Sequence, residues 1–200
     1  MDKHIVDHFK KADPILHAYF SKIELIPHKK SENLFHALTD EIISQQLSGK
    51  AAGTIFDRFK KLFPDENITP EKVMELPEEA IRGAGASWAK VRSLKSLAEH
   101  VLTKKLDLEH LESLPNAEVM NQLVQVKGIG PWTAEMFMMF TLGREDIFSH
   151  GDLGLKKAIQ KIYSFKKEPT QKQIEKIVKK WSPYKTYGSR ILWKVLDLKL

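Results

Sequence analysis

The sequence predicts an all-α fold, a compact bundle of about ten short helices. Apolar residues recur at three- and four-residue spacing through most of the chain, which places them on one face of a helix. Residue types that favour helix ends, such as proline, serine, threonine and aspartate, fall at the ends of these runs. No stretch shows the apolar–polar alternation between turn residues that is typical of half-buried strands.

The clearest helical runs lie between residues 34 and 102. Ser87 is expected to cap the last of them, and Thr69-Pro70 and Leu76-Pro77 each place a proline where a short helix could begin. The apolar positions form three groups: Leu34, Leu38, Ile42, Ile43 and Leu47; Ile55, Phe56, Phe59, Leu62 and Phe63; and Leu94, Leu97, Val101 and Leu102.

The second half of the chain continues the pattern. Two helices, about 116–126 and 131–142, are expected on either side of a short turn, and Asn116 and Thr170 are candidate helix caps. A further apolar run follows Asp152. Polar breaks fall near 27–32, 64–69, 83–87, 127–131, 143–151 and 164–170, and none is long enough to read as a domain linker.

Composition excludes several kinds of protein. A chain of 200 residues can bury a sizeable core. The absence of cysteine excludes disulfides, cysteine-ligated zinc and ordinary iron–sulfur clusters. No apolar run approaches the roughly 18 residues of a membrane span, and the polar start lacks a secretory signal. We therefore expect an intracellular protein with no membrane contact, in the cytoplasm and nucleoid of a bacterium or the nucleus of a eukaryote.

Charge is unevenly distributed along the chain. The overall net charge is +6, but residues 156–200 carry 13 Lys/Arg against 3 Asp/Glu, while residues 1–155 carry a small acidic excess. A basic end suggests a polyanionic partner such as nucleic acid. A lysine-rich solvated helix face is the alternative, and charge alone does not decide between them.

The turn at 127–131 has the composition of a phosphate site. Gly128 and Gly130 permit positive φ and close approach of another backbone, and Pro131 suits the first position of a helix. Ile129 between them can anchor the turn in the core. Such a turn directs backbone N–H groups outward at a helix N-terminus, where they can bind phosphate without a charged side chain. Two glycines alone would equally suit a tight connection between helices.

The longer sequence around this turn is more specific. Residues 123–136 closely resemble the hairpin of the helix-hairpin-helix DNA glycosylase superfamily, and Gly-Ile-Gly-Pro-Trp-Thr-Ala at 128–134 looks like its alkylated-base branch, 3-methyladenine DNA glycosylase II. The resemblance extends, in the family's order, to residues 43–48, 85–90, 151–158 and 181–193. It therefore covers most of the chain.

The resemblance implies both a fold and an activity. The fold would be a single glycosylase domain with a cleft between two helical subdomains, one at about 35–142 and one made of 1–34 and 143–200. The activity would be hydrolysis of the N-glycosidic bond of alkylated purines of the 3-methyladenine and 7-methylguanine type, in base excision repair. The partner would be double-stranded DNA that contains damaged bases, and the protein would act as a monomer.

Asp152 is the candidate catalytic carboxylate. Loss of a base develops positive charge on the deoxyribose, which a nearby carboxylate can stabilise while it orients or deprotonates a water. From its position alone, Asp152 reads first as the N-cap of the helix that follows. The resemblance matches it to the family's catalytic aspartate, and one residue can do both. Glu135, Glu145 and Asp146 match no such position and are interpreted as surface charges.

Trp132 occupies the position that a lysine fills in the related bifunctional enzymes. That lysine forms a Schiff base with the sugar before the strand is cut, and an indole cannot. Lys127 and Lys156 are close in sequence but do not match the position. The resemblance therefore implies base release without strand cleavage.

The resemblance also assigns residues to the base pocket and the DNA contact. Trp132 and Trp193 would line the pocket, where an indole face attracts a cationic alkylated purine, and Met136 replaces a tyrosine found in some relatives. Trp193 could equally be a core residue. Trp88 is the bulky candidate for a wedge that fills the gap left by the flipped base, although it could also pack inward. The DNA-contacting candidates are Gln46, Ser48, Ser87, Trp88, Lys127, Gly128, Ile129 and Gly130.

No cofactor is expected to be required. In relatives the hairpin often binds a monovalent cation through main-chain oxygens, so a structural Na⁺ or K⁺ could bind the carbonyls of Val124, Val126 and Ile129. Two other functions remain open at this point. One is a helix-hairpin-helix protein that binds DNA without catalysis, and the other is a glycosylase for other damaged or mismatched bases.

Overall fold

The computed structural model describes residues 2–26, 31 and 33–198 of the chain. Across these residues there are twelve α-helices and four short 3₁₀ helices, and no strand. This confirms the all-α prediction, with two more helices than expected because several are only four to six residues long. No helix in the described part of the chain is both long and apolar enough to cross a bilayer.

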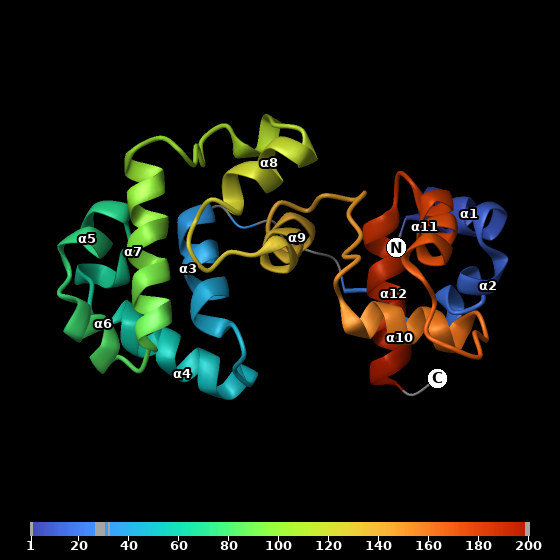
Figure 1. Cartoon of the computed structure of the whole chain (residues 1–200), viewed down its shortest axis with the longest axis horizontal. Helices are drawn as coiled ribbons and strands as arrows, with labels where there is room; N and C mark the ends of the chain where they lie inside the picture. The colour runs from blue at the N-terminus through green and yellow to red at the C-terminus, as the bar shows by residue number, and fades with distance from the viewer. Residues whose placement is uncertain (1, 27–30, 32, 199–200) are drawn as a thin grey trace. The chain divides into compact units, whose positions relative to one another are not determined.

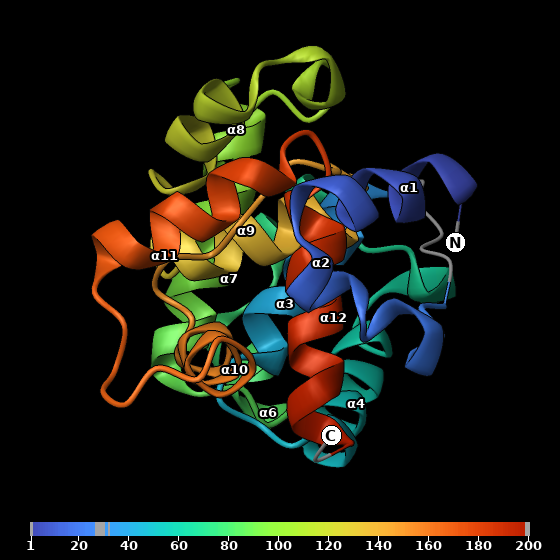
Figure 2. The same cartoon turned by 90° about the vertical axis from the view of Figure 1, so that its right-hand side faces the viewer.

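The chain folds as two compact units. One combines residues 1–29 with 143–200, and the other is residues 30–142. In the first unit, α12 packs against α10, and α1 and α2 close the opposite side of the core (Figures 1 and 2). Its helices are α1 (Lys3–Ala12), α2 (Pro14–His17), η1 (Phe20–Lys22), α10 (Leu153–Ile162), α11 (Gln171–Val178), η4 (Lys179–Trp181) and α12 (Lys185–Asp197).

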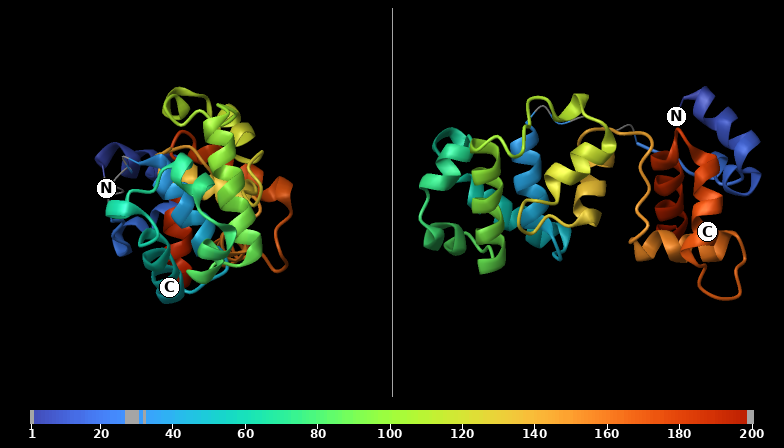
Figure 3. Two further views of the ribbon diagram at one scale, coloured as in Figure 1. Left: turned by 90° about the vertical axis from the view of Figure 1, so that its left-hand side faces the viewer. Right: turned by 45° about the horizontal axis from the view of Figure 1, so that its top comes forward.

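The second unit is built around α7. This helix packs against α5 on one side and α3 on the other, and α3 also contacts α4 and α9 (Figure 3). The helices are α3 (Leu34–Ser44), α4 (Gly49–Lys60), η2 (Pro64–Glu66), α5 (Pro70–Glu75), α6 (Glu78–Gly83), α7 (Trp88–Leu102), η3 (Leu111–Ser113), α8 (Asn116–Leu123) and α9 (Pro131–Phe140).

Most of the expected helix caps are present. The hydroxyls of Thr69 and Ser87 accept the amide three residues on, and Thr170 forms a full capping box with Gln173. Two expectations were wrong by one residue. Asn116 is the first helical residue rather than the cap, and Pro77 precedes the first residue of α6 instead of opening the helix.

Several predicted helices end earlier than expected, among them α4, which ends at Lys60 before Leu62 and Phe63. α8 stops at Leu123 rather than near 126, because the amides of Gln125 and Val126 bond three residues back and tighten the chain into a turn. The apolar run that begins at Leu34 was expected to include Leu47. The helix instead ends at Ser44, and Leu47 is 37% exposed. Of the predicted polar breaks, 27–32 lies almost wholly outside the described residues.

A buried carboxylate joins distant parts of the first unit. Asp13 accepts hydrogen bonds from the Trp181 indole N–H (2.8 Å), the Leu16 amide (3.1 Å) and the Tyr163 hydroxyl. Burial and the neighbouring carboxylate raise the pKa of Tyr163, so its hydroxyl stays a donor. These bonds link α2, η4 and the end of α10, and the framework that carries the start of α10 is therefore tied down at several points.

Candidate active site

Asp152 lies at the N-terminus of α10 with only 9% of its surface exposed. Its Oδ1 accepts the Leu155 amide at 2.7 Å, so the predicted N-cap is confirmed. The same oxygen accepts the indole N–H of Trp193 at 3.1 Å. Two donors and the positive end of a ten-residue helix therefore stabilise negative charge on this carboxylate and limit its rotation.

Trp193 comes from α12, 41 residues further along the chain. Part of its surface is buried against the core of the first unit, so it packs in the core and contacts Asp152 as well. Gly154 makes this approach possible. A Cβ at Gly154 would stand 3.0 Å from Asp152 Oδ1 and about 3.4 Å from Trp193 Cδ1. Sequence reasoning had passed over this glycine.

The irregular segment that leads to Asp152 is anchored on the start of α12. The Thr186 hydroxyl donates to the Arg144 carbonyl (2.6 Å), and the Thr186 amide donates to the Glu145 carbonyl (2.8 Å). Asp146 accepts the Ser182 hydroxyl at 2.6 Å and lies 3.5 Å from the ammonium of Lys185. Asp146 is a partly exposed charge, as the sequence suggested, and its Oδ2 also helps to fix this segment on the start of α12.

The hairpin between α8 and α9 has one glycine that the fold requires. Gly128 has φ +87°, and a Cβ there would stand 2.1 Å from Ser93 Oγ. Gly130 is different: its φ of −91° is ordinary, and a Cβ would meet nothing within 4 Å. Both glycines permit positive φ, and only Gly128 adopts it. Ile129 is 3% exposed and does anchor the turn in the core.

Pro131 opens α9, so the hairpin leads directly into a helix N-terminus. Gly130, which caps this ten-residue helix, is exposed, as are Lys127 and Gly128. An exposed turn with small side chains before a helix N-terminus can bring backbone amides against a phosphate. The arrangement has the geometry expected of an anion-binding turn.

A second exposed loop lies beside the hairpin. Residues 45–48 connect α3 to α4, and Gln46 has φ +58°, which non-glycine residues rarely adopt. The Gln45 side-chain amide donates to the Gly128 carbonyl (3.0 Å) and to Thr133 Oγ1 (3.2 Å), which joins this loop to the hairpin. Ser48 caps α4, and its side chain is exposed with those of Gln46 and Leu47.

The predicted aromatic residues of the second unit lie at helix starts. Trp132 in the first turn of α9 is 46% exposed, and Trp88 in the first turn of α7 is 44% exposed, beside the cap Ser87. The inward packing considered for Trp88 therefore does not occur. Met136 is 6% exposed, on the buried side of α9. Asp152 and Trp193 meet in one unit, and Trp132, Met136, Trp88 and the hairpin belong to the other.

The carbonyls proposed to bind a cation belong to the turn itself. Val124 is the C-cap of α8, and the Val126 carbonyl accepts the Ile129 amide at 3.0 Å. A carbonyl oxygen has two lone pairs, so this bond leaves Val126 able to bind an ion. Neutral oxygen donors suit a hard cation of low charge, and the donor set fits Na⁺ or K⁺. Binding of the ion stays a prediction.

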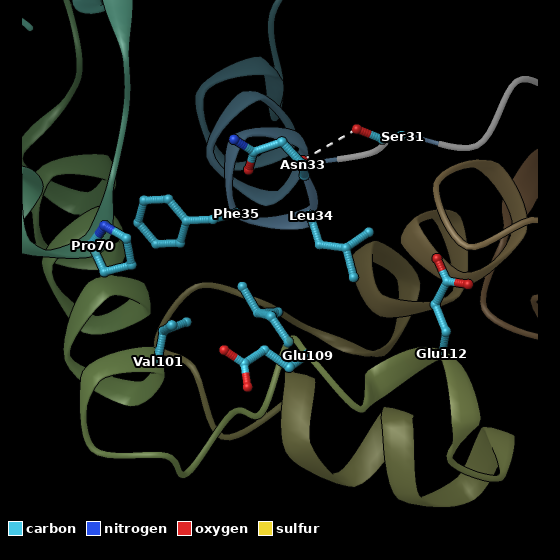
Figure 4. A pocket seen from close by; sticks show the side chains of 9 residues that line it. Ser31, Asn33, Leu34, Phe35, Pro70, Val101, Glu109 and Glu112 are labelled. Carbon is cyan, nitrogen blue, oxygen red and sulfur yellow. Dashed lines mark hydrogen bonds between the residues drawn. The ribbon is translucent and has the colours of Figure 1, made fainter.

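A large surface cavity in the second unit is not part of this site. It has a volume of about 770 Å³ and lies between the start of α3 and the end of α7 (Figure 4). These are the helix ends opposite to Gln45 and Trp88. Phe35, Val101 and Pro70 give it apolar walls, and Glu109 and Glu112 add two carboxylates. A site lined with carboxylates repels a polyanion, so the cavity does not suit nucleic acid.

The match to a family model decides the family. The model for HhH-GPD superfamily base excision DNA repair proteins matches residues 39–183, a span that includes the loop at 45–48, the hairpin and Asp152. The chain belongs to this family.

Relatives and solved structures agree with this HhH-GPD assignment. The Schizosaccharomyces pombe protein named DNA-3-methyladenine glycosylase 1 is 35% identical over 166 residues, which are 82% of this chain and 73% of the relative. The structure of a DNA-3-methyladenine glycosidase from Bacillus halodurans has a TM-score of 0.88 and 35% identity, covering 97% of this chain and 89% of that one. The S. pombe 3-methyladenine DNA glycosylase in complex with abasic DNA has a TM-score of 0.83 and 30% identity, covering 98% and 97%.

Three further features of this HhH-GPD chain, besides Gly154, were missed by sequence reasoning. They are the contacts of Gln45, the position of Lys90 and the exposure of Leu47. Lys90 is partly buried and donates to the carbonyls of Ile43 and Gln45. All three residues lie in the motifs at 43–48 and 85–90. The contacts of Lys90 and Gln45 join residues far apart in the sequence, and such contacts leave no periodic signal.

Proposed function

We propose that this protein is a monofunctional DNA glycosylase that releases alkylated purines from double-stranded DNA and leaves an abasic site. The observation that carries the proposal is the carboxylate of Asp152, which is nearly buried and held by two N–H donors at a helix N-terminus. Membership in a base excision repair family gives that carboxylate its reaction class. The relatives named for 3-methyladenine support the alkylated-base substrate.

The chemistry needs little more than a fixed negative charge. Alkylation at N3 or N7 makes the purine cationic, so the base can leave as a neutral molecule that takes the electron pair of the C1′–N bond. Positive charge then develops on the sugar, and the Asp152 carboxylate stabilises it. A water forms the new C1′–O bond and gives its proton to the carboxylate or to solvent. Atoms and charge balance without a cofactor.

In this proposal the hairpin and the loop at 45–48 bind the DNA backbone and groove. The exposed turn at Gly128 and Gly130 offers amides to a phosphate, and Lys127 adds a positive charge. Gln46 and Ser48 are exposed in the adjoining loop, and Ser87 and Trp88 at the start of α7. The basic residues of 156–200 favour the same polyanion through long-range attraction.

We also propose that Trp132, Trp193 and Met136 each contact the extracted base. An indole face attracts a cationic purine by about 0.5–2 kcal/mol. Trp132 stands at the lysine position of bifunctional relatives, so the strand stays intact after base release. We further propose that the protein works as a monomer and that it acts in the compartment that holds the cell's DNA.

The Asp152→Asn variant tests the proposed catalytic role. Asparagine keeps a similar shape and can still accept the Leu155 amide, but it lacks the negative charge. We expect single-turnover release of 3-methyladenine from methylated duplex DNA to fall by at least about a hundredfold. Affinity for abasic DNA should stay within a few-fold of the wild type. Base release within about tenfold of the wild type would show that another group stabilises the sugar cation.

A further inference from the structure

Lys90 makes contacts that a DNA-binding lysine would not need. It lies in the first turn of α7, and its Nζ donates to the carbonyls of Ile43 (2.6 Å) and Gln45 (2.9 Å) at the end of α3. The dipole of α7 disfavours a cation at that place, whereas the C-terminus of α3 favours it. The position of Lys90 is thus explained by the carbonyls of α3 and not by its own helix.

Gln45 connects this contact to the hairpin. Lys90 holds its carbonyl, and its side-chain amide donates to the Gly128 carbonyl and to Thr133 Oγ1. The next residue, Gln46, has φ +58° and is exposed. A residue in the left-handed region persists only where its surroundings determine the backbone. The two bonds of Lys90 therefore act on the backbone immediately before the strained residue.

We infer that Lys90 is a positioning residue, which fixes the loop at 45–48 against the hairpin so that both engage one DNA duplex, and that it does not itself bind phosphate. The inference rests on the proposed function, because it assumes that these two exposed loops contact DNA. Two loops bind one stiff ligand tightly only when their spacing is set before binding, since ordering them afterwards costs free energy. Loss of the Lys90 bonds frees the loop without removing any group that touches DNA.

The same helix provides a matched control. Lys95 donates its Nζ hydrogens to the carbonyls of Val73 (2.9 Å), Met74 (2.8 Å) and Leu76 (2.5 Å) at the end of α5. Burial lowers the pKa of both ammonium groups. Lys95 therefore performs the same capping chemistry at a helix end that has no bond to the hairpin.

The experiment compares Lys90→Met, Lys95→Met and Gln45→Leu in the full chain, with abasic duplex DNA as the probe. We expect both lysine variants to lose similar thermal stability. Lys90→Met and Gln45→Leu should each weaken abasic-DNA affinity by about tenfold or more, and the double variant should be little worse than either, because they act on one contact. Lys95→Met should bind like the wild type when corrected for its folded fraction. The salt dependence of binding should keep its slope in Lys90→Met.

Any of the following results would overturn the inference. Equal loss of affinity in Lys90→Met and Lys95→Met would mean that only global stability matters. A drop of about one in the slope of log affinity against log salt would mean that Lys90 contacts a phosphate. Additive effects of Lys90→Met and Gln45→Leu would separate the two residues. If Lys90→Met fails to fold, Gln45→Leu alone decides, and unchanged affinity there contradicts the inference.

The proposed function can fail independently of this result. If the wild type binds abasic DNA but releases no methylated base, the enzymatic proposal is wrong. The affinity measurements still decide the role of Lys90, because they do not depend on catalysis.

Discussion

At the scale of single residues, the hydrogen bond between Asp152 and Trp193 depends on Gly154, which has no side chain. Asp152 Oδ1 receives both the Leu155 amide and the Trp193 indole N–H. Gly154 leaves the space in which the indole reaches that oxygen. A small residue can therefore set the geometry of a carboxylate that it does not bind.

The Gly154→Ala variant separates stability from activity. Alanine has a higher helix propensity than glycine by about 1 kcal/mol, and Gly154 is part of α10. The new Cβ would stand 3.0 Å from Asp152 Oδ1, so the carboxylate or the indole must shift by a few tenths of an ångström. We expect an equal or higher melting temperature together with base release reduced about tenfold, because small misplacements are costly in catalysis. Full activity in this variant would show that the Trp193 contact is not needed.

At the scale of elements, the α8–α9 hairpin contains two glycines with different duties. Gly128 has positive φ and lies against Ser93, so the fold itself requires it. Gly130 has ordinary dihedral angles and open space around its Cα. The fold gives no reason for a glycine at 130, which leaves close approach of a ligand as its role in the proposed function.

This difference predicts opposite behaviour for two alanine variants. Gly128→Ala should lower the free energy of unfolding by at least about 1–2 kcal/mol, because of the strained φ and the clash with Ser93. Gly130→Ala should unfold at the same urea concentration as the wild type. It should nevertheless bind duplex DNA several-fold more weakly, because the methyl group separates the backbone from a phosphate. Normal DNA binding by Gly130→Ala would mean that the hairpin only connects two helices.

The helical elements were predictable because each leaves a local signal in the sequence. The spacing of Leu34, Leu38 and Ile42 predicts a buried helix face; Leu38 and Ile42 are fully buried, and Leu34 at the start of the helix is half-buried. The caps at Ser87 and Thr170 follow from hydrogen bonds that span only three residues. The end of α3 was not predictable in this way. Leu47 continues the apolar spacing, although the helix has already ended at Ser44.

The contacts of the candidate site were less predictable, because they join residues far apart in sequence. The Asp152–Trp193 bond spans 41 residues, and the Gln45–Gly128 bond spans 83. The spacing of apolar residues does not predict where the Trp193 indole or the Gln45 side-chain amide will lie. The motif around Gly128 indicated the right family because a hairpin needs its glycine, proline and apolar anchor in consecutive positions. The pocket, wedge and cation assignments stay predictions, since they concern what binds to these residues.

At the scale of the whole molecule, the proposed function is that of a helical protein that removes a base and leaves the DNA strand intact. The two units have different roles in this proposed function. One unit holds the carboxylate on the N-terminus of α10, and the other presents the hairpin and the loop at 45–48. In the proposed function, Trp132 takes the place of the amine that strand cleavage would need.

The most direct test is one time course with the unmodified protein and methylated duplex DNA. Free 3-methyladenine and strand breaks are measured in parallel, with and without alkali, and borohydride is added to a matched sample. We expect steady release of the free base, strands that break only after alkali, and no covalent protein–DNA complex. No release of free base, or strand breaks without alkali together with a trapped complex, would contradict the proposed function.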